Sequence, residues 1–341
     1  MHHYVTRAYL EGMLAEGEPR LWVYERNSDY AFRNIPKNLA SKRSYYTILG
    51  PDGKESDQVE KLLSHAIEGP GIHLLRLLAK KDSHQLNWPE RVQVSALIAV
   101  QEFRVPFARE QLEKMMHGIA NSFVNSALNT PGVIEGALDE MKDAGKLDAD
   151  ISAESMRKAF RDGDVVLKML PEASLQAMGH ILPLLIRTYA EMKWTVLTTL
   201  EGEFVTSDCP VCREYPITGT VSAGIANPDL TVCFPISQRR VLRLSHDHVR
   251  YEKFCRLIRA GREREAWKLR NRTPDISYQI IGRGEVEKVR GLIIRRAQRW
   301  VYSPSEDPSI ISQFRGECVN LRAEVEADQL RGWLKWTSRI Q

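Results

Sequence analysis

A short polar run in the second half of the chain has the residue types that a catalytic or metal site needs. Thr206, Ser207 and Asp208 follow a segment whose aromatic and β-branched residues predict a strand. A carboxylate at a strand end is fixed by the sheet and exposed by the turn, which suits a general base or a metal ligand. The same residue types also stabilise turns by hydrogen bonding to the backbone. The run therefore predicts either a reactive carboxylate or a structural turn.

Two histidines, His2 and His3, stand at the start of the sequence. Histidine is the side chain best suited to moving protons near neutral pH, so His3 is a candidate general acid or base. A histidine pair at a chain end also fits a metal-binding pair or a cloning remnant without a role.

A strongly helical stretch carries Gln101 and Arg104, which lie three residues apart and therefore share one face. The arginine could bind a phosphate or a carboxylate through two parallel hydrogen bonds. It could equally pair with a nearby acid. Glu60 and Glu68 on the preceding segment are the candidates, and they would form a carboxylate pair if both were buried.

Cys209 and Cys212 form a Cys-x-x-Cys motif, which supplies one half of a tetrahedral zinc site. The candidates for the other half are Cys233, His246, His248 and Cys255. Their spacing matches no standard zinc template, so we expect reduced thiols, and zinc binding by this motif stays open. The identity of any divalent metal or other cofactor is also left open.

Several nucleotide and hydrolase fingerprints are absent from the sequence. It has no P-loop, no Gly-x-Gly-x-x-Gly after a strand, no His-Glu-x-x-His and no Gly-x-Ser-x-Gly. This argues against nucleoside-triphosphate hydrolysis and nicotinamide chemistry.

The elements that would position these groups are mostly helices. Periodic apolar residues predict longer helices over residues 89–129, 172–200, 247–269 and 283–302 and a terminal helix over 320–337. Pro106 should divide the first of these. Strands are predicted near residues 20–26, 203–206, 230–234 and 240–244. We expect the first strand to pair with the later ones, which would bring the N-terminus close to the 206–210 turn.

The expected fold class is therefore α+β and mainly α. It has a helical body and a small mixed or antiparallel sheet formed by the N-terminal strand and the strands within 203–244. We expect a single domain over residues 1–303, with its β element at 203–244. Residues 304–341 are expected to form a C-terminal extension with the terminal helix.

Composition and charge limit the function classes. The chain has 43% hydrophobic residues among 341, which is enough for a substantial core. It has no apolar run long enough for a membrane span and no secretory signal, so we expect a cytoplasmic protein without membrane contact. The net charge is only +4. Most of the basic surplus lies late, at Arg239, Arg240, Arg243, Arg250, Lys253, Arg256, Arg259, Arg262 and Arg264. These residues form either a solvated helical face or a phosphate-facing surface.

Several short motifs, in the expected order, resemble those of DUF4238, an uncharacterised and mainly microbial family. Residues 3–6 are similar to its His-Tyr-Val-Pro opening, and residues 99–106 to its Ala-Leu-Gln-x-x-Arg-x-Pro helix. Residues 206–210 are similar to its Thr-Ser-Asp-Asn-Pro turn. Thr6 and Cys209 depart from the family pattern, which has Pro and usually Asn there.

The resemblance implies that His3 is a motif residue. It also implies a set of polar motif positions, which are His3, Lys42, Tyr46, Glu60, Gln101, Arg104, Thr206, Ser207 and Asp208. Polar side chains of these types would form a site if they gathered in one cleft.

Two functions of different classes fit these residues. The first is a hydrolase or nuclease-like effector acting on a phosphate-containing or nucleic-acid substrate. Its catalytic residues would be His3, Asp208, Arg104 and Glu60, and its substrate-binding residues Lys42, Tyr46, Gln101, Thr206 and Ser207. The second is a non-catalytic protein that binds nucleic acid or protein, in which the polar residues form a structural network and the basic 239–264 face carries the function. A closed, fully paired network favours the second. An oligomer or a partner protein stays open in both.

Overall fold

The structure is a computed structural model that describes residues 2–42, 48–49, 55–56, 61, 63–147, 150–162, 164, 171–215, 224–225 and 227–316. The chain forms two compact units. The first, which we call the body, comprises residues 1–105 and 180–341. The second, which we call the insert, comprises residues 106–179. The fold class is α+β, as predicted from the sequence.

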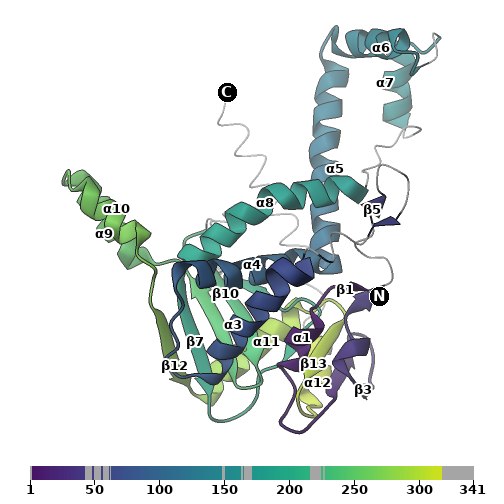
Figure 1. The fold of residues 1–341 in the computed structure, drawn as a ribbon. Helices are drawn as coiled ribbons and strands as arrows, with labels where there is room; N and C mark the ends of the chain where they lie inside the picture. Colours follow the sequence, from purple (N-terminus) through teal and green to yellow (C-terminus); the bar gives the residue numbers. More distant parts are fainter. Residues whose placement is uncertain are drawn as a thin grey trace. The chain divides into compact units, whose positions relative to one another are not determined.

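The helices of the body come from both ends of the chain (Figure 1). They are α1 (Arg7–Glu11), α3 (Gly69–Lys80), α4 (Trp88–Arg104), α9 (His248–Arg259), α10 (Glu263–Asn271), α11 (Arg283–Arg296) and α12 (Ser309–Gly316). A 3-10 turn (Pro36–Asn38) and a π-helical turn (Leu63–Glu68) precede α3. Helix α8 (Pro171–Glu191) begins in the insert and ends in the body.

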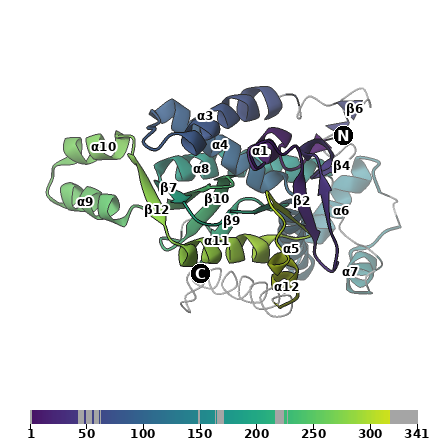
Figure 2. The same ribbon diagram turned by 90° about the horizontal axis from the view of Figure 1, so that it is seen from below.

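The larger sheet has the strand order β12-β7-β11-β10-β9. These strands are β7 (Lys193–Thr199), β9 (Cys212–Glu214), β10 (Thr231–Ser237), β11 (Arg240–Ser245) and β12 (Ile276–Ile281). Strand β12 is parallel to β7, and the other neighbours are antiparallel. Figure 2 shows this sheet between α3 and α4 on one side and α11 on the other. The body is therefore a three-layer arrangement of helix, sheet and helix.

A second sheet has the strand order β3-β2-β13-β8 and joins distant parts of the sequence. Its strands are β2 (Leu21–Glu25), β3 (Ala31–Asn34), β13 (Trp300–Ser303) and β8 (Thr206–Ser207). Two short pairs complete the described strands: β1 (His2–His3) with β4 (Ser41–Lys42), and β5 (Ile48–Leu49) with β6 (Glu55–Ser56). The N-terminal strand thus shares a sheet with the 206–207 strand, but β13 lies between them.

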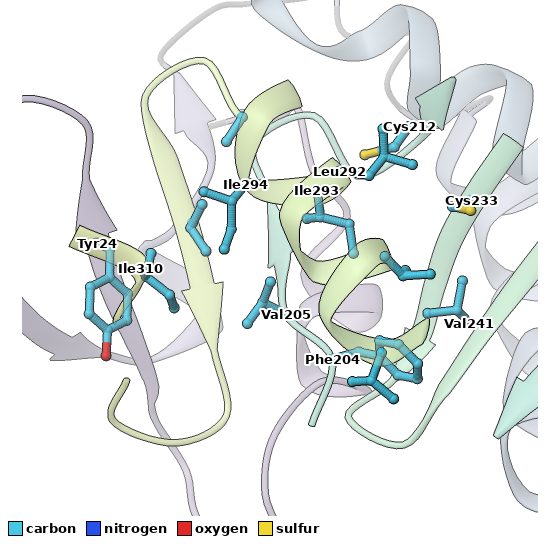
Figure 3. Packing of buried hydrophobic residues seen from close by; sticks show 14 of the residues in the cluster. Tyr24, Phe204, Val205, Cys212, Cys233, Val241, Leu292, Ile293, Ile294 and Ile310 are labelled. Carbon is cyan, nitrogen blue, oxygen red and sulfur yellow. The ribbon is translucent and has the colours of Figure 1, made fainter. Parts of the chain in front are cut away.

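Helix α11 fills the space between the two sheets. Its buried residues Leu292, Ile293 and Ile294 pack against Phe204 and Val241 in one hydrophobic cluster (Figure 3). All five side chains are at most 5% exposed. This core fixes α11 and the turn that leads from it into β13.

The insert contains α5 (Pro106–Asn129), α6 (Val133–Asp143) and α7 (Ala153–Asp162). Helix α4 ends at Arg104 and α5 begins at Pro106, so the predicted division at this proline is confirmed. Few insert side chains are buried within the part that the structure describes. They are Leu112, Leu128 and Leu138.

Three predicted helices have different ends in the structure. The helix predicted over 172–200 stops at Glu191, and β7 follows it, because a continuous apolar run does not distinguish a buried strand from a buried helix. The helix predicted over 283–302 stops at Arg296 and gives way to β13. The helix predicted over 247–269 is two helices, because Gly261 adopts a φ of +68° that a continuing helix excludes.

The described helices were also searched for a membrane span. None of them is long and apolar enough to cross a bilayer.

Candidate functional site

Helix α4 carries two of the candidate residues and begins at a strong sequence signal. The Asn87 side chain accepts a hydrogen bond from Glu90 N–H at 3.0 Å, and the Glu90 carboxylate accepts one from Asn87 N–H at 2.9 Å. This reciprocal capping fixes where the helix starts. The helical register then places Gln101 and Arg104, each 1% exposed, one turn apart on the buried face.

Gln101 binds the N-terminal segment through both ends of its amide. Its Oε1 accepts from Thr6 N–H at 3.1 Å and from the Thr6 hydroxyl at 3.2 Å. Its Nε2 donates to the Tyr4 carbonyl at 2.8 Å. A proline at position 6, as in the motif that residues 3–6 resemble, would supply neither of the two donors, so both contacts depend on Thr6.

Arg104 forms an ion pair with Glu68, whose side chain is only 13% exposed. Its Nη1 also lies 3.5 Å from the Thr6 hydroxyl. The acid that pairs with this arginine is therefore Glu68, one of the two candidates from the sequence. Glu60 lies outside the described residues. Removing one partner of a buried ion pair strongly destabilises the folded protein, because the other charge is left buried without a partner.

Asp208 lies just after β8 and closes the turn between α11 and β13. Its Oδ1 accepts from Gln298 N–H at 2.8 Å, and its Oδ2 accepts from Arg299 N–H at 2.7 Å and Trp300 N–H at 3.2 Å. Its own N–H donates to the Trp300 carbonyl at 3.0 Å. Burial raises the pKa of the Asp208 carboxyl, and the three N–H donors oppose that rise.

The neighbouring hydroxyls are also paired within the protein. The Tyr9 hydroxyl and Thr206 Oγ1 are hydrogen bonded at 2.7 Å, and both side chains are buried. Ser207 Oγ accepts from Cys209 N–H at 3.1 Å.

Burial, with a contribution from the Asp208 charge, raises the pKa of Tyr4 to about 12.

His3 and Lys42 lie in the small β1–β4 pair. His3 Nε2 lies 3.1 Å from the Lys37 carbonyl, and because a carbonyl only accepts, this nitrogen carries the proton. Lys42 is on β4, with an exposed side chain. Tyr46 lies outside the described residues, as Glu60 does.

The structure thus brings five of the nine candidates into the interior of the body, namely Gln101, Arg104, Thr206, Ser207 and Asp208. We call four of these (Gln101, Arg104, Thr206 and Asp208), together with Thr6, the polar lock. It ties the N-terminal segment, α4, β8 and the α11–β13 turn to one another. Both carboxylate oxygens of Asp208 hold peptide N–H groups, so this arrangement favours a structural role over proton transfer or metal binding.

The cysteines of the Cys-x-x-Cys motif are buried free thiols. Burial raises the pKa of both motif thiols, Cys209 and Cys212. Cys212 lies opposite Cys233 across the β9–β10 ladder, and burial raises the pKa of Cys233 to about 12. A thiol that stays protonated is a poor nucleophile and a poor metal ligand. Among the described residues, no group of three or more His, Cys, Asp or Glu side chains is arranged to hold a metal ion.

Part of the late basic surplus has internal partners. Arg240 donates to the carbonyls of Leu78 and Lys81 at the end of α3, at 3.0 and 2.6 Å. Arg239 binds the Gly202 carbonyl, and Arg243 pairs with Glu285 at 3.2 Å. These three arginines stabilise the fold, which neither sequence interpretation of the basic stretch anticipated.

The remaining basic residues gather on the helical pair α9–α10. Figures 1 and 2 show these two helices side by side, extending beyond the sheet next to β12. We call residues 248–272 the basic hairpin. It contains nine Lys and Arg residues and three Glu residues, a surplus of six that exceeds the net charge of +4 of the whole chain.

Five cations of the basic hairpin are exposed and form neither an ion pair nor a contact with an aromatic ring within the part of the chain that the structure describes. They are Lys253, Arg256, Arg259, Arg264 and Lys268. Other hairpin arginines have partners: Arg262 pairs with Glu265, and Arg250 donates to the carbonyls that end α10.

An exposed tryptophan accompanies these cations. Trp267 is 49% exposed and lines a shallow hollow on α10 together with Glu263, Arg264, Lys268, Asn271 and Arg272. The basic face predicted from the sequence ended at residue 264 and so omitted this part. The signal that could have found it is a tryptophan followed by three basic residues, Lys268, Arg270 and Arg272.

The fold and these two features define an α+β protein with a buried polar lock and an exposed basic hairpin. The chain belongs to the DUF4238 family, described as proteins of unknown function, whose model matches residues 1–307. This confirms the resemblance found in the sequence motifs. No curated protein and no solved structure matches the chain.

Proposed function

We propose that this protein is a non-catalytic nucleic-acid-binding protein that contacts the phosphate backbone through the basic hairpin. The observation that carries the proposal is the set of five exposed hairpin cations that have neither an internal ion pair nor a contact with an aromatic ring. Cations with no internal acid are available to replace the counterions that surround a nucleic-acid backbone.

The charge distribution supports a polyanionic ligand. Arg256 and Arg259 follow Lys253 at intervals of three residues, so they form one arc along the exposed side of α9. Arg264 and Lys268 extend the cationic surface onto α10. A repeating cationic arc suits the regular phosphate spacing of a nucleic acid better than the irregular charges of a folded protein surface.

The polar lock supports the non-catalytic part of the proposal. Asp208 and Gln101 direct their polar atoms to backbone groups of the same chain. The alternative hydrolase or nuclease, with His3, Asp208, Arg104 and Glu60 as its catalytic residues, stays a prediction. No observation on the described residues favours it over binding.

Fluorescence anisotropy with a labelled oligonucleotide tests the proposal. The variant replaces Lys253, Arg256 and Arg259 with Gln, and we expect it to bind at least about tenfold more weakly because three phosphate contacts are lost. The matched control replaces Lys80, Lys81 and Lys193, three exposed lysines of the body, with Gln and removes the same charge. It should stay within about twofold of the wild type.

Equal losses in the two triple variants would mean that overall charge, and not the basic hairpin, attracts the ligand. The oligonucleotide is also recovered after incubation with the protein and Mg²⁺ or Mn²⁺. Intact recovery is the expected result. Shortened products would overturn the non-catalytic assignment in favour of a nuclease.

A further inference from the structure

Trp267 is held in a fixed position although half of its surface is exposed. Its ring packs edge-on against Phe254 of α9, with centroids 5.9 Å apart and an interplanar angle of 78°. The Arg270 guanidinium lies 5.3 Å from the Trp267 centroid and 5.8 Å from that of Phe254. A large aromatic ring that is both exposed and braced by its neighbours is suited to stacking, because little side-chain freedom is lost when a ligand binds.

The surroundings of Trp267 are cationic. Arg264 precedes it by three residues and Asn271 follows it by four, so both lie on the same face of α10 as the ring. Lys268 and Arg272 complete the cationic lining of the hollow, and Glu263 is its one acid. Phosphate-binding groups therefore lie within about one helical turn, roughly 5 Å, of the stacking surface.

We infer that the basic hairpin takes single-stranded nucleic acid, with an unpaired base stacked on Trp267 and the adjacent phosphates on Arg264 and Lys268. This inference rests on the proposed function and names its substrate class. A base inside a duplex is already stacked on both faces, so only an unpaired base can offer a face to the indole. The backbone cations alone would accept either form of nucleic acid.

An acidic protein segment is the competing occupant of this surface. It would satisfy the cations, but a peptide carboxylate gains little from an indole face. The aromatic ring between cations therefore favours a ligand in which planar groups and negative charges alternate, as they do along a single strand.

The test compares a single strand with a duplex of the same length in the full-length protein, by anisotropy at fixed salt. We expect tighter binding of the single strand. Trp267→Leu should lower the single-strand affinity about tenfold and the duplex affinity by much less. Trp267→Phe keeps an aromatic face and should restore most of the single-strand affinity.

The matched control is Trp88→Leu, which removes another exposed tryptophan, 38% exposed, from the start of α4. We expect it to change neither affinity. Circular dichroism of both leucine variants establishes that the helices are retained.

The outcomes separate this inference from the proposed function. Equal affinity for single strand and duplex, with no effect of Trp267→Leu, would overturn stacking and leave hairpin binding of nucleic acid in place. Binding of neither form would overturn both. Tryptophan-dependent binding of a poly-glutamate peptide at the affinity of the single strand would also overturn the inference, because a peptide of that kind offers no base.

Discussion

At the scale of single residues, the motif side chains act as substitutes for backbone partners. Gln101 offers one acceptor and one donor to residues 4 and 6, as a neighbouring strand would. Asp208 accepts hydrogen bonds from three peptide N–H groups that a tight turn leaves without backbone partners. Buried polar groups are costly unless they are paired, so side chains that pair them determine which turn the chain can make.

The buried phenol of Tyr4 predicts that the stability of the protein depends on pH above 10. Its pKa is raised from 10.0 to about 12 in the folded protein. Because the unfolded chain ionises first as the pH rises above 10, the free energy of unfolding should fall between pH 10 and 12, with Tyr4 contributing roughly 2 kcal/mol of the loss. Below pH 10 the phenol is neutral in both states and this contribution to stability is fully present.

Urea denaturation at pH values on either side of 10 measures this effect. Tyr4→Phe should lose less stability across the interval than the wild type. Tyr30→Phe is the control, because Tyr30 is 81% exposed, and it should behave as the wild type does. Identical losses in Tyr4→Phe and the wild type would refute the role of this phenol.

The sequence located most of these residues but not their partners. It placed Asp208 at a strand end and left a catalytic base and a turn residue as alternatives. The N–H groups that its carboxylate binds, which favour the turn residue, are at residues 298–300, about ninety positions along the chain, in a segment predicted to be helical. For Arg104, the sequence named both glutamates as candidates, and only three-dimensional packing selects Glu68.

At the scale of elements, the same contact recurs: an arginine from another segment donates hydrogen bonds to the carbonyls at the C-terminal end of a helix. Arg26 donates to the Ala297 carbonyl at the end of α11, at 2.6 Å, and Arg240 donates to the carbonyls at the end of α3. Arg250 does so at the end of α10, and Arg91 at the end of α8. The last carbonyls of a helix lack intrahelical donors and carry partial negative charge, so a guanidinium satisfies both needs.

Arg91 allows the contribution of such a contact to stability to be measured. It is fully buried, donates to the carbonyls of Ala190, Met192 and Pro274, and lies 4.1 Å from the Trp194 ring centroid. Arg91→Met keeps an unbranched apolar side chain in place of the aliphatic part of the arginine and removes the donors. We expect a loss of about 3 kcal/mol in the free energy of unfolding, because buried carbonyls are left unpaired.

Chemical denaturation of Arg91→Met measures this loss. The control is Arg187→Met, whose guanidinium pairs with Glu191 on the surface and should contribute at most about 0.5 kcal/mol. A loss in Arg91→Met as small as that of the control would show that the buried carbonyls find other donors.

The element predictions failed where a strand follows a helix directly. Residues 193–199 continue the apolar character of α8, so periodicity alone extended the helix through them. Their β-branched Thr and Val residues favour a strand, but that preference is decided by pairing with β11 and β12, which no local pattern shows. Strand β13 was missed for the same reason, since it exists only between β2 and β8.

At the scale of the whole molecule, the two units differ in how much they bury. The body has a continuous core around α11 and two sheets. The described side chains of α5, α6 and α7 include only three buried leucines, at positions 112, 128 and 138. Local stability follows the density of buried apolar contacts, so the insert should open more readily than the body.

Hydrogen exchange measured by mass spectrometry tests this difference. We expect amides of α5, α6 and α7 to exchange at least about tenfold faster than those of α4 and α11. Equal protection in the two units would mean that the chain opens only as one cooperative whole.

The position of β13 between β2 and β8 in the second sheet has a consequence for synthesis on the ribosome. Strands β2 and β3 emerge before the other strands of their sheet, but the second partner of β2 is β13, residues 300–303, so one edge of β2 stays open until these residues have been made. At ordinary rates of translation that delay is on the order of tens of seconds. Nascent chains therefore carry an unpaired strand edge from the synthesis of residue 25 to that of residue 300, and such an edge can pair with other chains until β13 covers it.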